Sequence, residues 1–334
     1  MNTLGTLYRV SIFGESHGAC VGALVDGAPA GIPLDERFIQ NELNRRKPGK
    51  SKLESPRKEE DKLEILSGVF KGKTTGAPVC MLIRNKDADS SAYERIKAIA
   101  RPGHTDWVAH EKFGGFNDYR GSGIFSGRLT AATVMGGALA KLALRRKGIS
   151  ISSRIISIGG CENPRQFDKI IEGAKQAGDS VSASIECTAN GLPAGLGEPR
   201  AGGLDAELAR AILAIPAVKG IKFGNMQDLG SINNDEFAIS KGRIITKTNN
   251  SGGVLGGIST GMPLVFTVDF KPTPSIGKKQ KSVNFLTKKE TELQIGGRHD
   301  VCVGLRAPPV VEAATACVLL DLGLQAQLIP RIFK

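Results

Sequence analysis

Several residue types are scarce in this sequence of 334 residues, and each scarcity narrows the possible functions. Aromatic residues make up 5% of the chain, with one tryptophan and three tyrosines. Single-stranded nucleic acids bind in grooves where basic side chains alternate with aromatic ones on which the bases stack. No stretch of the sequence shows that alternation. Nucleic-acid binding is therefore disfavoured, and a steep salt dependence in a filter-binding titration would be the result that favours it.

Long apolar runs are also missing, since none approaches the roughly 20 residues that a membrane-spanning helix needs. The first segment, MNTLGTLYRVSIFGESHG, is interrupted by Arg9, Glu15 and His17 and does not resemble a secretory signal peptide. The six cysteines include no CxxC pair. They are expected to be free thiols in a reducing compartment, with no spacing typical of a zinc site. We expect a cytoplasmic protein without a metal.

Positive charge and glycine, by contrast, are abundant. The formal net charge is +12, and 42 residues are glycine. A basic protein raises the local concentration of anions, and glycine allows tight turns and a close approach of a ligand to the backbone. The anion could be a nucleic acid, an acidic membrane or a small phosphorylated metabolite.

Short β-branched segments bounded by glycine or proline predict strands, and longer segments with capping residues predict helices. Strands are expected at 7–13, 22–26, 63–70, 78–84, 182–188, 254–259 and 264–270, and helices at 35–46, 126–147, 205–214 and 310–324. The helix over 126–147 has an inner face of alanine and glycine. Glycine costs about 1 kcal/mol against alanine inside a helix, so close packing against another element is the expected reason for this face.

Two motifs occur twice, in the same order. DGAPAG at 26–31 returns as NGLPAG at 190–195, and GVFKGKTTGAP at 68–78 returns as GVLGGISTGMP at 253–263. Chance recurrence of common turn sequences is the alternative. A duplication explains the order better. It predicts one domain over 1–334 with pseudo-repeats at about 4–148 and 150–326, of α+β class, with two antiparallel sheets enclosing long helices and one cleft at the join.

Three of the four histidines lie in glycine-rich polar loops. They are His17 in GESHG, His104 in RPGHTD and His299 in GGRHD, whereas His110 lies in a helix-like context. A single histidine is usually structural, but loops carried by a rigid scaffold are where catalytic groups concentrate. Ser16 and His17 are adjacent, and neighbouring residues rarely present their side chains to each other, so a hydrolase triad is disfavoured.

Arginines cluster in the same loops. They are Arg46, Arg101, Arg120, Arg128 and Arg298. Guanidinium groups match phosphate and carboxylate oxygens in a bidentate manner. The segment DYRGSGIFSGR at 118–128 is a glycine-rich loop that leads into a helix N-terminus, which is a favourable place for an anion. These residues predict a small ligand with several anionic groups.

Ten blocks together resemble the chorismate synthase family over nearly the whole chain. They are FGESHG at 13–18, RRKPG at 45–49, EILSGVFKGKTTGAP at 64–78, RPGHTD at 101–106, DYRGSG at 118–123, GLPAGLGEP at 191–199, PAVKGI at 216–221, GGVLGGISTG at 252–261, KPTPSI at 271–276 and GRHDVCVG at 297–304. Their number and order make the resemblance specific.

The resemblance implies a trans-1,4-elimination of phosphate from 5-enolpyruvylshikimate 3-phosphate to give chorismate, the seventh step of the shikimate pathway. It implies a need for reduced FMN without net redox change, a β-α-β sandwich fold and a homotetramer. It further implies that His17 and His104 donate protons, that Ser16 assists, and that Asp300 relays the abstracted proton. A glycine fingerprint for a nicotinamide dinucleotide is missing, so an external flavin reductase is expected to supply the reduced flavin.

The resemblance also implies two sets of binding residues. Substrate anions would be held by Arg46, Lys52, Arg101, Arg128 and Arg298. The flavin would lie against Ile124, Phe125, Ser126, Pro216, Ala217, Gly256, Lys271, Pro272, Thr273, Pro274, Ser275 and Arg298.

The chain departs from the family pattern in one loop. Many members have GGGRSSAR where this chain has GSGIFSGR, so Ile124 and Phe125 replace an arginine and a serine. Lys52 stands at a second basic position where arginine is frequent. Two alternatives stay open. A flavin reductase or other flavoprotein would consume a nicotinamide donor without substrate, and a decayed homologue would have lost the reaction.

Overall fold

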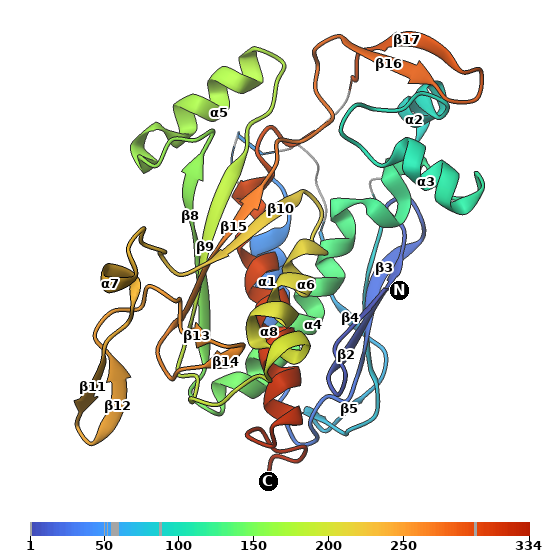
Figure 1. The fold of residues 1–334 in the computed structure, drawn as a ribbon. Coiled ribbons are helices and arrows are strands. Elements are labelled where there is room, and N and C mark those ends of the chain that lie inside the picture. The colour runs from blue at the N-terminus through green and yellow to red at the C-terminus, as the bar shows by residue number, and fades with distance from the viewer. Residues whose placement is uncertain (1, 50, 52, 55–59, 87–88, 297–298) are drawn as a thin grey trace.

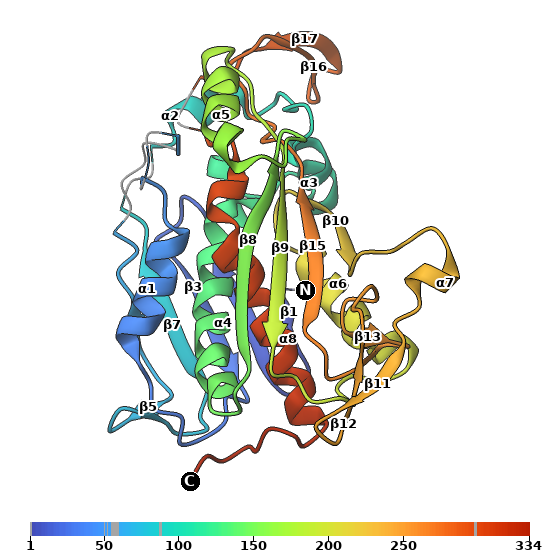
Figure 2. The same cartoon turned by 90° about the vertical axis from the view of Figure 1, so that its left-hand side faces the viewer.

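Two antiparallel sheets lie on either side of a layer of helices in the computed structural model, which describes residues 2–334 except 50, 52, 55–59, 87–88 and 297–298 (Figure 1). The first sheet has the strand order β1-β2-β3-β7-β4 and the second the order β10-β15-β9-β8. Turned by 90°, the molecule shows α4 and α8 running between the strands of the two sheets (Figure 2). The expected α+β sandwich is confirmed.

The first sheet is built from β1 Thr3–Leu4, β2 Arg9–Gly14, β3 Cys20–Asp26, β4 Glu64–Ile65 and β7 Val79–Arg84, and the second from β8 Ser150–Ile158, β9 Ala183–Asn190, β10 Val218–Phe223 and β15 Leu264–Phe270. Two-stranded ribbons are β5 Val69–Phe70 with β6 Lys73–Thr74, β11 Phe237–Ser240 with β12 Arg243–Thr246, β13 Val254–Leu255 with β14 Ile258–Ser259, and β16 Gln280–Asn284 with β17 Lys289–Leu293. The α-helices are α1 Glu36–Arg46, α2 Ser91–Ile96, α3 Asp106–Phe113, α4 Thr130–Arg145, α5 Phe167–Gln176, α6 Leu204–Leu213, α7 Gly230–Asn233 and α8 Pro308–Gln325.

The pattern of buried residues explains why these strands form a sandwich. Along β9 every second residue from Ala183 to Ala189 is buried, and β15 pairs with it in register from Ala183↔Phe270 to Ala189↔Leu264. Side chains alternate between the two faces of a strand, so one face of this sheet packs on the helices.

The helix layer is centred on α4 and α8, which lie side by side. Every residue of α8 from Pro309 to Leu324 is buried, which is the pattern of a helix enclosed on all sides. An added Cβ at Gly137 of α4 would lie 2.3 Å from Cα of Ala313. The alanine and glycine face of α4 therefore allows the close helix contact that the sequence predicted.

The two repeated motifs form matching structures. Gly31 N donates to Thr74 O at 2.8 Å, and Gly195 N donates to Ser259 O at 2.9 Å. The hydroxyls of Thr74 and Ser259 also make the same pair of hydrogen bonds. Each accepts from the backbone N–H of the residue directly after the motif's proline-alanine-glycine, Ile32 or Leu196, and donates to the carbonyl of the motif's proline. This agreement supports the proposed duplication.

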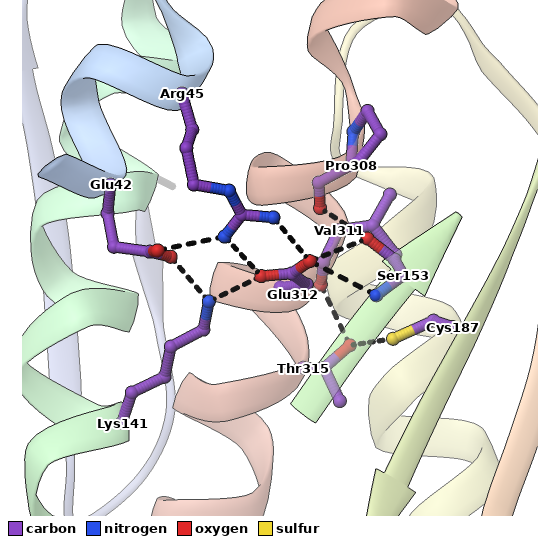
Figure 3. A network of polar contacts seen from close by, with 9 residues as sticks. All are labelled: Glu42, Arg45, Lys141, Ser153, Cys187, Pro308, Val311, Glu312 and Thr315. Carbon is purple, nitrogen blue, oxygen red and sulfur yellow. Dashed lines mark hydrogen bonds and ion pairs between the residues drawn. The ribbon is translucent and has the colours of Figure 1, made fainter. Parts of the chain in front are cut away.

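Four charged side chains join the helices inside the sandwich (Figure 3). Lys141 of α4 bridges Glu42 of α1 and Glu312 of α8, and Arg45 of α1 makes a bidentate pair with Glu312 at 2.7 Å. Glu312 also accepts from Ser153 of β8. Glu42, Lys141 and Glu312 are buried and Arg45 is partly exposed, so two cations balance two anions and the end of α1 is fixed against α8.

Two expected strands differ in the structure. The segment expected as one strand at 63–70 contains β4 and β5, which are separate because Gly68 has a φ of 82° and turns the chain. The segment at 254–259 is a hairpin, because Gly256 and Gly257 have φ values of 60° and 85°. Strands β8, β10, β16 and β17 and helix α5 are among the elements that the sequence did not predict.

Candidate active site

A cavity of about 520 Å³ lies at the end of the helix layer where α1 ends and α8 begins. Its walls come from the end of α1, the loops at 101–105 and 121–128, the segment at 213–219, the segment at 270–275, and the residues before and at the start of α8. Residues from both proposed pseudo-repeats thus line it. The volume suits a small-molecule site.

The walls carry an excess of positive charge. Six cationic side chains line the cavity: Arg46, Arg101, Arg128, Lys219, Lys271 and Arg306. Among the described lining residues the only acid is Asp300, whose carboxylate forms an ion pair with Arg306. Such a cavity favours a ligand that carries several negative charges.

Arg46 and Arg128 share one buried carboxylate. Asp61 accepts from Nη1 of Arg46 at 3.2 Å and forms a second ion pair with Nη1 of Arg128, and its side chain is 0% exposed. Burial lowers the pKa of Arg46 to about 9 against the opposing effect of Asp61, and Arg306 and Arg128 lower it further. A bound anion beside Arg46 would oppose this lowering.

Arg101 and His104 share a second carboxylate, that of Asp106. Arg101 donates to both carboxylate oxygens at 2.7 Å, and Nδ1 of His104 lies 2.8 Å from Oδ1. Burial would raise the pKa of Asp106, but the hydrogen bonds from Arg101 and His104 outweigh it and hold that pKa well below its usual range. Burial lowers the pKa of His104, Asp106 opposes this, and Arg101 and Lys271 add to the lowering.

Ser16 and His17 lie directly behind the cavity wall. An added Cβ at Gly121 would lie 2.3 Å from Cδ2 of His17 and 2.8 Å from Oγ of Ser16. Ser16 Oγ accepts from Ser126 Oγ at 3.1 Å, and His17 Nδ1 hydrogen bonds with Ser90 Oγ at 2.8 Å. Both residues therefore contact the glycine loop that forms the wall, and neither is among the residues that line it.

The structure brings most of the expected flavin-binding residues to this cavity. Those that line it are Ile124, Phe125, Ser126, Pro216, Ala217, Lys271, Thr273, Pro274 and Ser275. Pro272 is exposed between lining neighbours. Gly256 lies at the turn between β13 and β14 and is not among the lining residues. Lys52 and Arg298 lie outside the described residues.

Two buried polar atoms of the cavity walls support a bound polar group. Within the described part of the chain, Oγ1 of Thr273 and Nε of Arg306 are buried without a hydrogen-bond partner. Such groups cost free energy unless a ligand or water pairs with them. Together with the apolar wall at Ile124, Phe125 and Pro216, they fit a flat heterocycle that carries oxygen and nitrogen atoms.

Five polar groups in or behind the cavity wall escaped the sequence reasoning. Ser122, Lys219 and Arg306 line the cavity, and Asp61 and Asp106 pair with its arginines. Asp106 stands two residues after His104, and that spacing was a usable signal. Nothing in the sequence indicated that Asp61, which lies in a charged segment, forms ion pairs with two arginines.

The part of the chain that the structure describes lacks two features of other protein classes. No helix in that part of the chain is long and apolar enough to cross a membrane. No group of three or more histidine, cysteine or acidic side chains within it could hold a metal ion.

The fold and the cavity define a class: a β-α-β sandwich with a cationic pocket for a multiply anionic small molecule. A family model described as chorismate synthase matches residues 8–324. Chorismate synthases of Dehalococcoides mccartyi and Archaeoglobus fulgidus are 46% and 47% identical, covering 100% and 99% of this chain and 99% of each relative. A relative from Aeropyrum pernix is 47% identical over 97% of this chain and 93% of its own length.

A solved structure agrees with these relatives. A crystal structure of chorismate synthase superposes with a TM-score of 0.75 at 29% identity, covering 96% of this chain and 93% of the other. The chain belongs to the chorismate synthase family, and as an enzyme it is a lyase. The resemblance seen in the sequence motifs is thereby confirmed.

Proposed function

We propose that this protein eliminates phosphate from 5-enolpyruvylshikimate 3-phosphate to form chorismate, with reduced FMN as the cofactor. In this reaction one C–H bond and the C–O bond to phosphate break, a new carbon–carbon double bond forms, and the products are chorismate, phosphate and a proton. The observation that carries the proposal is a cavity lined by six cations and one acid, which stays cationic after Asp61 and Asp106 have paired with three of the arginines. A substrate with two carboxylates and a phosphate matches this charge.

The arginines would bind the substrate anions and stabilise the departing phosphate. Arg46 and Arg128 are held together by Asp61, and Arg101 is held by Asp106, so the three guanidiniums are positioned before a ligand enters. Preorganised cations that face a developing negative charge stabilise the transition state. Lys52 and Arg298 stay predicted members of this set.

His104 would act as a general acid beside the arginines. The protonated imidazole can give a proton to the departing phosphate or to the ring system bound next to it. His17 and Ser16 would act from behind Gly121, where they contact the same loop. Asp300, paired with Arg306, is a carboxylate that can receive the proton lost from carbon.

The walls formed by Ile124, Phe125, Pro216, Ala217 and the segment 271–275 would hold the flavin. The apolar residues would cover the ring system, Thr273 Oγ1 would pair with a polar ring atom, and Lys271 would offset phosphate charge. When bound, reduced FMN would supply an electron-rich ring that assists the elimination. Ile124 and Phe125 give this wall an apolar character where many family members carry an arginine and a serine.

The remaining expectations concern the protein as a whole. We propose a homotetramer in the cytoplasm that receives reduced flavin from an external reductase. Size-exclusion chromatography with light scattering tests the tetramer. Oxidation of NADPH by the purified protein without substrate would contradict the external source and would favour a flavin reductase.

Anaerobic turnover tests the reaction and the cofactor together. The purified protein is mixed with 5-enolpyruvylshikimate 3-phosphate and dithionite-reduced FMN, and chorismate is followed by absorbance. We expect product with reduced FMN and none with oxidised FMN. A folded sample that forms no product would refute the proposal and favour a decayed homologue.

A further inference from the structure

A chain of hydrogen bonds at the cavity wall joins four side chains from two segments, 101–106 and the glycine loop that holds Ser122. Nδ1 of His104 lies 2.8 Å from Oδ1 of Asp106, and Nε2 of His104 lies 3.0 Å from Oγ of Ser122. Nη2 of Arg101 donates to the same Ser122 oxygen at 3.2 Å. Both His104 and Ser122 line the cavity.

Asp106 is the nearest partner of Nδ1 of His104, at 2.8 Å, and favours one tautomer over the other, while Nη2 of Arg101 lies farther from the same nitrogen, at 3.2 Å. The Asp106 carboxylate also receives two hydrogen bonds from Arg101 and stays ionised, so it can only accept from Nδ1. Neutral His104 therefore carries its proton on Nδ1 and leaves a lone pair on Nε2. Because Ser122 Oγ already accepts from Arg101, its own hydrogen is free to point at that lone pair.

Ser122 holds a backbone conformation that serine adopts at a cost. Its φ is 74°, between Gly121 at 54° and Gly123 at 51°. Residues other than glycine seldom occupy this left-handed region, and strain of this kind concentrates at functional sites. A glycine would fit the turn without strain, so the presence of a side chain here points to a use for its hydroxyl.

We propose that Ser122 relays protons between His104 and the ligand in the cavity. This rests on the proposed function. In the step, the N–H bond at Nε2 of protonated His104 breaks, its proton passes to Ser122 Oγ, and the serine O–H proton passes to a phosphoryl oxygen or a ring nitrogen of the bound group. Ser122 ends as a hydroxyl, and His104 ends as the neutral Nδ1–H form.

The surroundings of His104 favour this route. The charged groups that face it are Asp106 on α3, Arg101 before that helix, and Lys271 after β15. Asp106 occupies Nδ1, and Ser122 covers Nε2, so both ring nitrogens already have partners. A proton that leaves Nε2 toward the cavity therefore meets the Ser122 oxygen first.

The tautomer can be measured without any substrate. Nitrogen-15 NMR of histidine-labelled protein resolves few signals, because the chain has four histidines, and His104→Gln assigns the one of interest. We expect neutral His104 to be protonated at Nδ1 and its pKa to rise in Ser122→Gly, since the serine hydrogen bond stabilises the neutral ring. A neutral ring protonated at Nε2 would overturn the relay.

Two variants separate a relay from a structural role. Ser122→Gly removes both the hydroxyl and the strain, and Ser122→Asn keeps a hydrogen-bond donor in a residue that tolerates positive φ but cannot pass a proton onward. We expect kcat to fall about 100-fold in both variants with little change in KM, the range seen when general acid catalysis is lost. The melting temperature of Ser122→Gly should equal or exceed that of the wild type.

Lys241→Gly is the matched control, because Lys241 has a φ of 50° in the exposed turn between β11 and β12. It should leave kcat unchanged. Full kcat with an unchanged pH profile in Ser122→Gly would overturn the proposal, as would rescue by Ser122→Asn. An inactive wild type would instead refute the proposed function, while the NMR result would still decide how His104 and Ser122 share their proton.

Discussion

Asp61→Asn is the substitution that best tests how the anion cavity is built. It replaces a fully buried carboxylate with an amide of the same size and leaves Arg46 and Arg128 without the charge they share. Asparagine tolerates the left-handed φ of 50° found at Asp61, so the backbone should not change. The variant therefore isolates the effect of one negative charge.

The expected loss of stability is large. Removing one partner of a buried ion pair costs about 3–5 kcal/mol because the remaining charge is left uncompensated. For a chain of this length the entropy of unfolding converts that loss into a fall of about 4–7 °C in melting temperature. Differential scanning fluorimetry or calorimetry of the two proteins measures it.

Inorganic phosphate provides a second readout of the same charge. An anion in the cavity can replace the missing carboxylate, so phosphate should raise the melting temperature of Asp61→Asn more than that of the wild type. Asp26→Asn is the control, since Asp26 pairs with Arg9 at an exposed position, where a pair contributes about 0–1 kcal/mol. If Asp61→Asn had the melting temperature of the wild type and phosphate raised both melting temperatures equally, the reasoning about the shared carboxylate would be refuted.

Four further predictions follow from the same geometry. His104→Gln should abolish most of the elimination and leave folding intact, and activity together with far-UV circular dichroism checks this; a variant with the wild-type rate would remove His104 from the mechanism. The lowered pKa of His104 means that the folded protein binds fewer protons here than the unfolded chain, so this group's contribution to stability should be complete above pH ~6.5 and decline as the pH falls below it. In urea titrations between pH 5 and 8, the free energy of unfolding of His104→Gln should fall less steeply with decreasing pH than that of the wild type. Glu312→Gln should lower the free energy of unfolding by about 3–5 kcal/mol, because Arg45 and Lys141 lose a shared buried partner, and an equal midpoint in urea would contradict this. Gly121→Ala should reduce both stability and kcat, because its Cβ would lie 2.3 Å from the His17 ring at a φ of 54°, and a crystal structure or NMR spectrum with an unmoved His17 would count against it.

The sequence alone predicted the parts of the fold that depend on local pattern. The helix at 35–46 begins with Asp35 as its cap and ends at Arg46, as expected, because capping and charge placement are local effects. The strand at 264–270 has the expected bounds. Strand β8 was missed because it contains four serines and an arginine and its exposed residues alternate with half-buried ones, and only pairing with β9 makes it a strand.

The candidate site likewise contains residues that local sequence pattern could predict and residues that it could not. Residues in glycine-bounded motifs, such as His104 and Arg128, could be selected from the sequence because their neighbours indicate loops that face a ligand. Asp61 and Arg306 could not, because each acts on residues that are distant in the chain. Gly256 was selected from the sequence as a flavin contact, but the turn between β13 and β14 is enough to explain a glycine at this position. Its contact with a flavin stays a prediction.

The position of α8 in the chain has a consequence for biosynthesis. This helix is buried along nearly its whole length between the two sheets, yet it follows every strand of both sheets in sequence. During translation the inner faces of the strands therefore stay exposed until residues 308–325 have left the ribosome. Chains that depend on such distant contacts fold slowly and are open to aggregation meanwhile. We expect nascent chains stalled before Pro308 to be sensitive to protease and to bind chaperones, and chains released beyond Gln325 to become resistant.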